Sequence, residues 1–211
     1  MPTVFTHPAP VLALGAILGG RLLPPRMLLF GVICAVLPDA DVIGFRFGIR
    51  YADLLGHRGF SHSLLFAVIM GLVGAFLAPR LRGGRVMGFG VGFFAVASHI
   101  LLDAMTSGGL GVAAFWPFDS ARHFCEWRPI RVSPFGLRAL LSERGLAVFY
   151  SELRWVWLPC AGVGLSLWLA RRLWRACVPG SPGPQGDAPR GGRAALRRRA
   201  VSEGRPRFPR D

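Results

Sequence analysis

The stretch that decides the fold is Val86-Met-Gly-Phe-Gly-Val-Gly-Phe-Phe-Ala-Val-Ala-Ser-His-Ile-Leu-Leu-Asp103, an apolar run that ends in two ionisable side chains. His99 and Asp103 are four residues apart, so a helix places them on one face, one turn apart. An imidazole and a carboxylate in that arrangement can share a metal ion. The alternative is a His–Asp pair that only holds helices together, but ionisable groups inside apolar segments are costly and generally functional.

The rest of the chain is equally apolar. Of its 211 residues 52% are hydrophobic, and the mean hydropathy is +0.44. This composition is too apolar for an ordinary soluble domain and excludes a disordered chain or a coiled coil. The four cysteines show no C-x-x-C spacing, which excludes a disulfide scaffold. We therefore predict an all-α membrane protein.

Further apolar stretches lie on both sides of the quoted segment. The predicted helices are Pro8–Gly20, Met27–Phe45, Leu64–Ala78, Val86–Leu102 and Trp155–Ala170. Several are shorter than the roughly 20 residues that cross a bilayer, so a buried helix of a soluble all-α enzyme is an alternative for any one of them. Tryptophans at both ends of the last stretch are typical of the aromatic belts at the membrane interfaces. We predict a polytopic membrane protein with about five apolar helices.

The C-terminal part differs in composition. Residues 178–211 are rich in Arg, Pro and Gly and cannot bury enough apolar area to offset ordering, so we predict a disordered basic tail. The membrane-embedded domain is predicted over residues 1–177. The basic tail and the net charge of +14 favour attraction to anionic membrane lipids. Stacking aromatics are nearly absent from the tail, which argues against specific nucleic-acid binding.

Arginines in the short connections predict the orientation. Arg21 and Arg26 lie between the first two segments, and Arg80, Arg82 and Arg85 lie between the third and the fourth. Basic short loops are typically cytoplasmic, so the tail is predicted in the cytoplasm and the N-terminus outside. The long connection before the last segment is also rich in Arg, but long loops follow this rule weakly.

In this orientation, one set of residues falls at the outer ends of the segments, which suggests a single site. The set is His7, Asp39, Asp41, His57, His62, His99, Asp103 and His123.

An acidic motif, Leu37-Pro-Asp-Ala-Asp41, follows the second apolar segment. Pro38 disfavours helix at Leu37, so the next residues are predicted to be extended or in a turn. Asp39 and Asp41 then project near the interface. They are either a solvated helix terminus or, with partners, groups that bind a metal or orient water.

The partners are predicted in Gly56-His-Arg-Gly-Phe-Ser-His-Ser63. His57 and His62 would lie about 140° apart on a single helix, so we expect the glycines to form a turn and Ser61 to cap a helix that begins at His62. Both imidazoles can then converge. Arg58, between them, is suited to bind a phosphate or carboxylate.

Three more residues are weaker candidates. His7, just before the first segment, is either an ordinary interfacial histidine or a further ligand on the common side. His123 and Glu126 are another possible ligand pair, and we leave them outside the predicted site because an ordinary loop role explains them better.

The three motifs, residues 37–41, 56–63 and Ser98-His-Ile-Leu-Leu-Asp-Ala-Met-Thr106, occur in an order that resembles a known family. It is the membrane-bound, predicted metal-dependent hydrolases of bacteria, of the LexA-regulated inner-membrane type, and the likeness covers about residues 1–135. The resemblance implies an inner-membrane enzyme distantly similar to zinc-dependent phospholipase C and P1 nuclease. Those helical enzymes cleave phosphate esters and contain an H-x-x-x-D helix, which His99 and Asp103 match. His123-Phe-Cys-Glu126 departs by one residue from their H-x-x-x-E pair.

We therefore predict a metal site at the membrane interface. The predicted metal ligands are His7, His57, His62, His99 and Asp103. Asp39 and Asp41 would serve as further ligands or as the base, and Arg58 would offset charge on a phosphoryl group. Imidazole and carboxylate ligands without thiolate favour Zn²⁺, with Mn²⁺ as the alternative, in one or two ions. The predicted reaction is hydrolysis of a phosphate ester, lipid-derived being one option, by metal-activated water.

Two other classes of membrane protein stay open. A protein that binds or transports a divalent cation without catalysis would also carry intramembrane His and Asp. A transporter typically places such ligands near the bilayer midplane on broken helices, whereas these motifs lie at one edge. The other class is a structural membrane protein whose polar residues only pair with one another.

Overall fold

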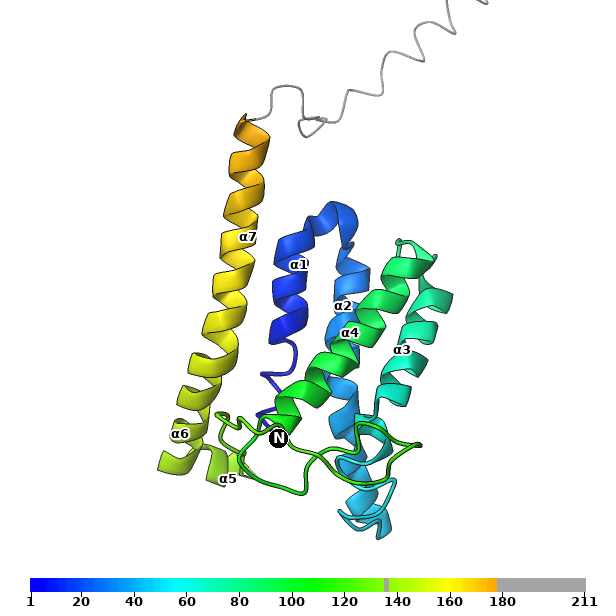
Figure 1. The fold of residues 1–211 in the computed structure, drawn as a ribbon, viewed down its shortest axis with the longest axis vertical. Helices are drawn as coiled ribbons and strands as arrows, with labels where there is room; N and C mark the ends of the chain where they lie inside the picture. The colour runs from blue at the N-terminus through cyan, green and yellow to red at the C-terminus, as the bar shows by residue number, and fades with distance from the viewer. Residues whose placement is uncertain (135–136, 178–211) are drawn as a thin grey trace, which may run out of the picture. The chain divides into compact units, whose positions relative to one another are not determined.

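The computed structural model describes residues 1–134 and 137–177, and this part of the chain is helical with no β-strand (Figure 1). The predicted all-α class is therefore confirmed. The chain divides into two units, Met1–Arg171 and Arg172–Asp211, and the site lies within the first. The predicted disordered tail, residues 178–211, lies outside the described residues.

The helices follow the predicted apolar segments closely. The α-helices are α1 (Ala9–Leu22), α2 (Pro25–Val36), α3 (Leu64–Leu77), α4 (Arg85–Ala104), α5 (Leu137–Leu140), α6 (Glu143–Glu152) and α7 (Leu158–Cys177). Two 3₁₀ segments, η1 (Leu37–Phe47) and η2 (Phe60–His62), and a π-helical segment, η3 (Leu153–Trp157), complete the described elements.

Three helical runs are long and apolar enough to cross a membrane. They are Pro25–Phe47, Arg85–Ala104 and Glu143–Trp174. Two of the predicted segments form the shorter apolar helices α1 and α3. The third run begins before the predicted Trp155, because α6 and η3 lead into α7 without a break.

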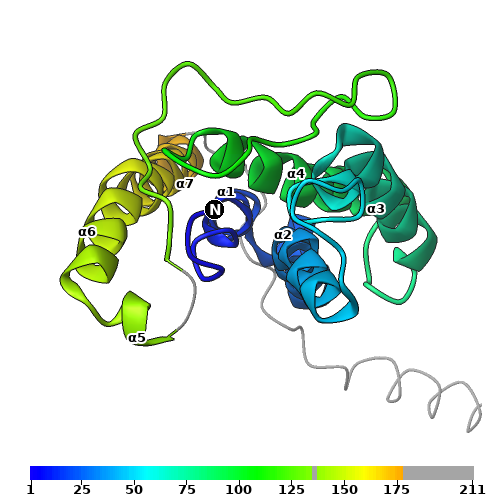
Figure 2. The same cartoon turned by 90° about the horizontal axis from the view of Figure 1, so that it is seen from below.

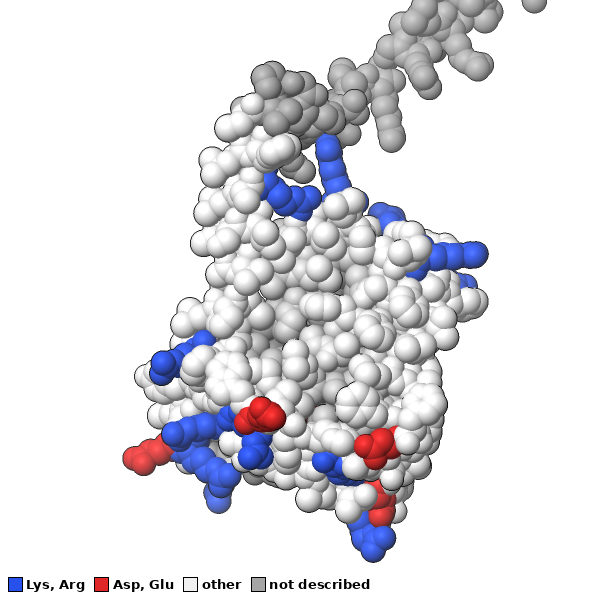
Figure 3. All heavy atoms as spheres, in the orientation of Figure 1, with Lys and Arg blue, Asp and Glu red and all other residues white. Residues whose placement is uncertain are grey.

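The charged residues leave an uncharged band on the face shown in Figure 3. On this face, Arg side chains gather at one end, charges of both signs gather at the other, and the surface between them carries neither. The connections at the basic end lie side by side, because Arg26 Nη1 donates to the carbonyl oxygen of Arg80 at 3.4 Å. This distribution is typical of a protein that crosses a bilayer.

The core of the unit depends on a close crossing of α3 and α4. A Cβ atom added to Gly74 would collide with the carbonyl oxygen of Gly88, and one added to Gly88 would collide with that of Gly74. Only glycine lets two backbones approach this closely, and small residues are enriched where membrane helices pack. The buried side chains of Met27 and Val91 extend the core toward α2.

The end of α2 corrects one expectation from the sequence. Leu37 is helical, with dihedral angles of −55° and −39°, and of the two expected conformations for the residues after Pro38 the structure has the turn, which continues as a 3₁₀ helix over Leu37–Phe47. Proline lacks an N–H, so the α-helical bonding pattern stops, but the tighter i→i+3 pattern still forms around it. As a result Asp39 turns inward and is 6% exposed, so it does not belong to a solvated helix terminus, the first of the two alternatives.

The N-terminal segment lies at the end of the unit opposite the basic connections. Figure 2, seen from below, shows the N-terminus among α1, α2 and α4. The long connection after α4 crosses this same end. Side chains from distant parts of the sequence therefore meet here.

The α3–α4 crossing gives the first prediction. Gly88→Ala should destabilise the protein by about 1–3 kcal/mol, since the added methyl group meets backbone that cannot move aside. Gly90→Ala is the matched control on the same helix, because an added methyl group there would meet nothing within 4 Å, and it should be neutral or slightly stabilising. Thermal unfolding in detergent, followed by tryptophan fluorescence, measures both. Equal midpoints for the two variants would contradict the close crossing.

Candidate metal centre

Four ionisable side chains from three elements converge in the interior. Asp39 comes from η1, His62 from η2, and His99 and Asp103 from one face of α4. The Nε2 atoms of His62 and His99 lie 3.0 Å apart. Asp39 Oδ1 lies 3.7 Å from the first and 3.6 Å from the second, and Asp103 Oδ2 lies 3.4 Å from His62 Nε2. We call these four residues the buried cluster.

His7 joins the buried cluster from the N-terminal segment. Its Nε2 lies 3.5 Å from Asp39 Oδ2 and 3.8 Å from Asp103 Oδ1. Its ring stacks on that of His99, with centroids 3.7 Å apart. The structure therefore places His7 among the other predicted ligands, although it precedes them by more than thirty residues in the sequence.

A hydrogen bond fixes which nitrogen of His99 faces the cluster. The carbonyl oxygen of Ala35 can only accept, so His99 Nδ1, at 2.8 Å, must donate to it. The neutral ring then directs the lone pair of Nε2 at His62 and Asp39. This is the usual arrangement of a metal-binding histidine, whose second nitrogen is held by an outer partner.

Asp41 organises a second group next to the first. Its Oδ1 lies 2.7 Å from His57 Nδ1, and its Oδ2 lies 3.2 Å from His62 Nδ1 and accepts from Ser61 Oγ at 2.7 Å. His62 thus contacts Asp41 with one nitrogen and the buried cluster with the other. The structure places the predicted ligand His57 in this second group, beside the buried cluster.

The Ser61 contact corrects another expectation. Ser61 does not cap a helix, because the helix begins at Leu64 and Ser63 Oγ accepts from the Phe66 amide at 3.1 Å. Ser61 instead donates to Asp41, a role that sequence reasoning missed. Both serines satisfy the general preference for a hydroxyl at a helix start, so the pattern alone does not separate them.

Arg58 is completely buried beneath the cluster. Its Nε lies 2.9 Å from Asp103 Oδ2, and its two terminal nitrogens donate to Thr106 Oγ1 at 2.8 Å and the Gly108 carbonyl at 2.9 Å. Its φ of 66° is in the left-handed region, which costs a non-glycine residue free energy and is commonly found at functional sites. Direct contact with a phosphate, the role predicted for Arg58, would require these contacts to be exchanged, and that role stays a prediction.

The donor set fits a divalent cation. Within the described residues, both oxygens of Asp39 and both ring nitrogens of His7 are buried without a hydrogen-bond partner, whereas Asp103 forms an ion pair with Arg58. Buried carboxylates are costly unless they are paired or bind a metal. Asp39, Asp41 and Asp103 carry three negative charges against the guanidinium of Arg58. Imidazole nitrogens and carboxylate oxygens are ligands that Zn²⁺ and Mn²⁺ accept.

The pKa values of His7 and His62 show how burial and the neighbouring carboxylates affect the protonation of these two rings. Burial lowers the pKa of His7 below its ordinary value. Burial also disfavours the charged form of His62, but the neighbouring carboxylates of Asp103, Asp39 and Asp41 outweigh it and raise the pKa to about 10. The negative field at this point therefore favours a positive charge, whether a proton or a cation supplies it.

His123 and Glu126 are not brought to the cluster. His123 Nε2 lies 2.8 Å from Asp119 Oδ2, and both side chains are more than 40% exposed. Glu126 is exposed on the same connection. Neither belongs to the two groups of potential metal ligands in the described part of the chain.

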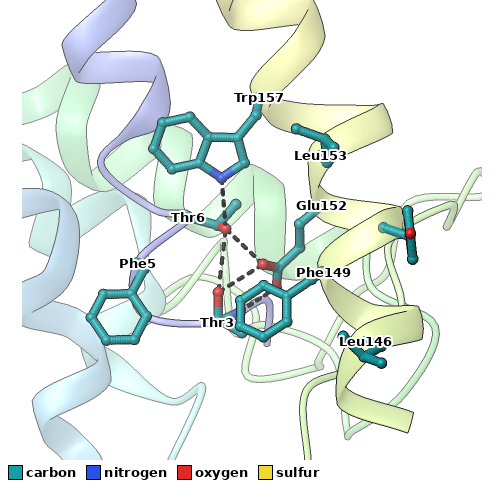
Figure 4. A pocket seen from close by; sticks show the side chains of 9 residues that line it. Thr3, Phe5, Thr6, Leu146, Phe149, Glu152, Leu153 and Trp157 are labelled. Atoms are coloured by element: carbon teal, nitrogen blue, oxygen red, sulfur yellow. Dashed lines mark hydrogen bonds between the residues drawn. The ribbon is translucent and has the colours of Figure 1, made fainter. Parts of the chain in front are cut away.

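A buried glutamate that sequence reasoning missed holds the N-terminal segment (Figure 4). Glu152, at the end of α6, is 1% exposed and accepts hydrogen bonds from Thr3 Oγ1 at 2.7 Å and Thr6 Oγ1 at 2.8 Å. The Thr3 amide donates to its other oxygen, and Trp157 Nε1 donates to Thr6 Oγ1 at 3.1 Å. Because Thr6 precedes His7, this network positions His7. The signal in the sequence was a lone acid in the apolar stretch 145–158.

Comparison with known proteins agrees with a membrane location. The model of the family described as YdjM inner membrane protein matches residues 1–176. The inner membrane protein YbcI of Escherichia coli (strain K12) is 44% identical over 82% of this chain and 100% of its own length. The inner membrane protein YdjM of the same strain is 31% identical over 60% of this chain and 61% of its own. No solved structure matches.

The geometry predicts metal retention. Protein purified in detergent should keep at least about one Zn²⁺ or Mn²⁺ per chain, and His99→Ala should weaken this binding by about 10–100-fold or more, since it removes a nitrogen from the centre of the cluster. His123→Ala, which changes an exposed histidine, is the matched control and should keep the wild-type content. Elemental analysis after desalting measures all three. Wild-type protein that stays metal-free after incubation with both ions would exclude the site.

Proposed function

Because the chain belongs to the YdjM family of inner membrane proteins, we propose that its buried cluster is the centre of a membrane-bound, metal-dependent hydrolase that acts on phosphate esters. One observation carries the proposal: the carboxylates of Asp39 and Asp103 converge on the Nε2 atoms of His62 and His99 in a buried site, and neither oxygen of Asp39 has a hydrogen-bond partner there. A purely structural His–Asp pairing would provide hydrogen-bond partners for the oxygens of Asp39.

Asp39, His62, His99 and Asp103 would hold the metal, with His7 beside them. A bound Zn²⁺ or Mn²⁺ supplies an activated water and stabilises negative charge on a phosphoryl oxygen. The chain's own contribution is orientation: the Ala35 carbonyl holds His99, and Asp41 holds both His62 and His57.

Arg58 and Asp41 act around the ligands in this proposal. The Arg58 guanidinium offsets the charge of Asp103 and fixes its carboxylate, which keeps the second oxygen directed toward His7. The oxygens of Asp41 already bind His57, Ser61 and His62. Asp41 can therefore receive a proton from the reaction only by way of the His57 or His62 ring. Within the cluster, an oxygen of Asp39 that does not hold the metal would accept the proton, because neither oxygen of this side chain has a hydrogen-bond partner.

The reaction is tested by a screen of metal-loaded protein against phosphomonoesters, phosphodiesters and phospholipids. Turnover should require metal and should fall by at least about 10²-fold in Asp103→Ala, because that variant removes a ligand and leaves the buried guanidinium of Arg58 without its ion-pair partner. Asp119→Ala is the matched control, since it deletes an exposed carboxylate outside the cluster, and it should keep wild-type turnover.

Turnover that is equal in Asp103→Ala and wild type would contradict the hydrolase proposal. If no substrate in the panel is cleaved and the same protein moves Zn²⁺ or Mn²⁺ across liposomes, the cation-transport alternative replaces it.

We also propose that the cluster lies on the outer side of the inner membrane, with the tail in the cytoplasm. The support is the Arg-rich end formed by the α1–α2 and α3–α4 connections, which the positive-inside rule assigns to the cytoplasm. The buried cluster lies at the opposite ends of α2 and α4.

Cysteine labelling tests this orientation in a background without the native cysteines. Phe118→Cys, at a side chain that is 97% exposed on the cluster side, should react with an impermeant thiol reagent in intact cells. Gly84→Cys, in the α3–α4 connection where a side chain meets no neighbour, should react only after the cells are permeabilised. The reverse pattern would place the cluster in the cytoplasm.

A further inference from the structure

A cavity beside α2 extends to Asp39 of the buried cluster. The cavity, of about 520 Å³, lies between the N-terminal segment and the end of α2, a size typical of small-molecule sites. Its walls are mainly apolar. The residues that line it include Val4, Val32, Ile33, Val36, Leu37 and Asp39. We call this cavity the α2 groove.

The α2 groove faces the bilayer. Ile33 and Leu37 are 54% and 38% exposed, and both lie in Pro25–Phe47, a run long and apolar enough to span the membrane. An apolar surface exposed along such a run is in contact with hydrocarbon.

The inner end of the groove is a ligand of the buried cluster. Asp39 lines the groove, is only 6% exposed, and has two oxygens with no hydrogen-bond partner. The groove therefore joins the lipid-facing surface to the site that would bind the metal. Asp39 is the one lining residue with an ionisable side chain. The other lining side chains are apolar and form no hydrogen bonds with a polar ligand.

We propose that the α2 groove binds the acyl chain of a membrane lipid phosphate, so that the phosphate lies at Asp39 and the buried cluster. The proposal rests on the proposed phosphoesterase function and names its substrate class. A water-soluble phosphate ester would gain nothing from walls of valine, isoleucine and leucine. A lipid already in the bilayer can move sideways into the groove without exposing its chain to water.

The groove contributes orientation more than affinity. A chain in the bilayer is already surrounded by hydrocarbon, so its transfer to an apolar groove yields little hydrophobic gain. Fixing the chain along α2, however, brings the phosphate to one place and one orientation, and such positioning lowers the barrier to a reaction between bound groups.

A larger cavity elsewhere lacks this connection. About 560 Å³ lies beside Phe149 and Tyr150, and its carboxylate is that of Glu152 (Figure 4). One oxygen of Glu152 accepts from the hydroxyls of Thr3 and Thr6 and the other from the Thr3 amide, so it leaves no unpartnered oxygen for a metal or a phosphate. This cavity is therefore the internal comparison for the groove.

Photolabelling tests the proposal without requiring turnover. The probe is a long-chain alkyl phosphate with a diazirine a few carbons from the phosphate, added to zinc-loaded full-length protein in vesicles of phosphatidylethanolamine and phosphatidylglycerol. After irradiation, peptide mass spectrometry should find most of the label on Val4 and residues 32–37. The label should be lost in Ile33→Trp, which fills the groove. Leu29→Trp, an exposed position one turn away on α2 that does not line the groove, should keep it.

A probe with the same chain and a trimethylammonium head separates phosphate recognition from simple lipid contact, and it should not concentrate on residues 32–37. Label spread evenly over exposed lipid-facing positions such as Phe76 and Leu165, or label gathered at Phe149 and Tyr150, would overturn the groove. Groove labelling without any turnover would support the lipid site and contradict the hydrolase. Turnover without groove labelling would support the hydrolase and overturn the lipid site.

Discussion

At the buried cluster, the carboxylates of Asp39, Asp41 and Asp103 lie beside one guanidinium, that of Arg58. The side chains of Asp39, Asp41 and Asp103 are 5%, 7% and 0% exposed, and Arg58 forms its ion pair with the last of them. Such an imbalance is unfavourable in a buried site, and it is tolerable only where a proton or a cation supplies the missing positive charge. The other polar contacts of the site serve to hold these carboxylates and their imidazole neighbours in place.

Local backbone geometry follows from that requirement. The 3₁₀ segment after Pro38 turns Asp39 inward, and the left-handed conformation of Arg58 brings its guanidinium beneath Asp103. Gly59 permits the tight turn beside it, since a Cβ atom there would collide with the carbonyl oxygen of Leu54. Conformations that are unfavourable in isolation persist because the surrounding contacts determine them.

The sequence was informative where the chemistry is local. His99 and Asp103 were paired correctly because helical periodicity alone sets their relation, and the glycine-flanked histidines were correctly expected to turn toward a common region. Prediction failed where distant contacts decide. The rule for Pro38 is a local preference that tertiary packing overrides, and the choice between Ser61 and Ser63 as the cap depends on Asp41, twenty residues away from the first. No pattern in the first ten residues indicates that Thr3 and Thr6 bind Glu152.

That last contact also sets an order of assembly. Thr6 and Glu152 are 146 residues apart, and they meet only when the final helical run is in place. A chain is made and inserted from its N-terminus, so α1 reaches the membrane while the helix that carries Glu152 does not yet exist. His7 therefore has no fixed position beside Asp39 until the last span has entered. The cluster is therefore completed late, when the N-terminal segment binds the end of α6.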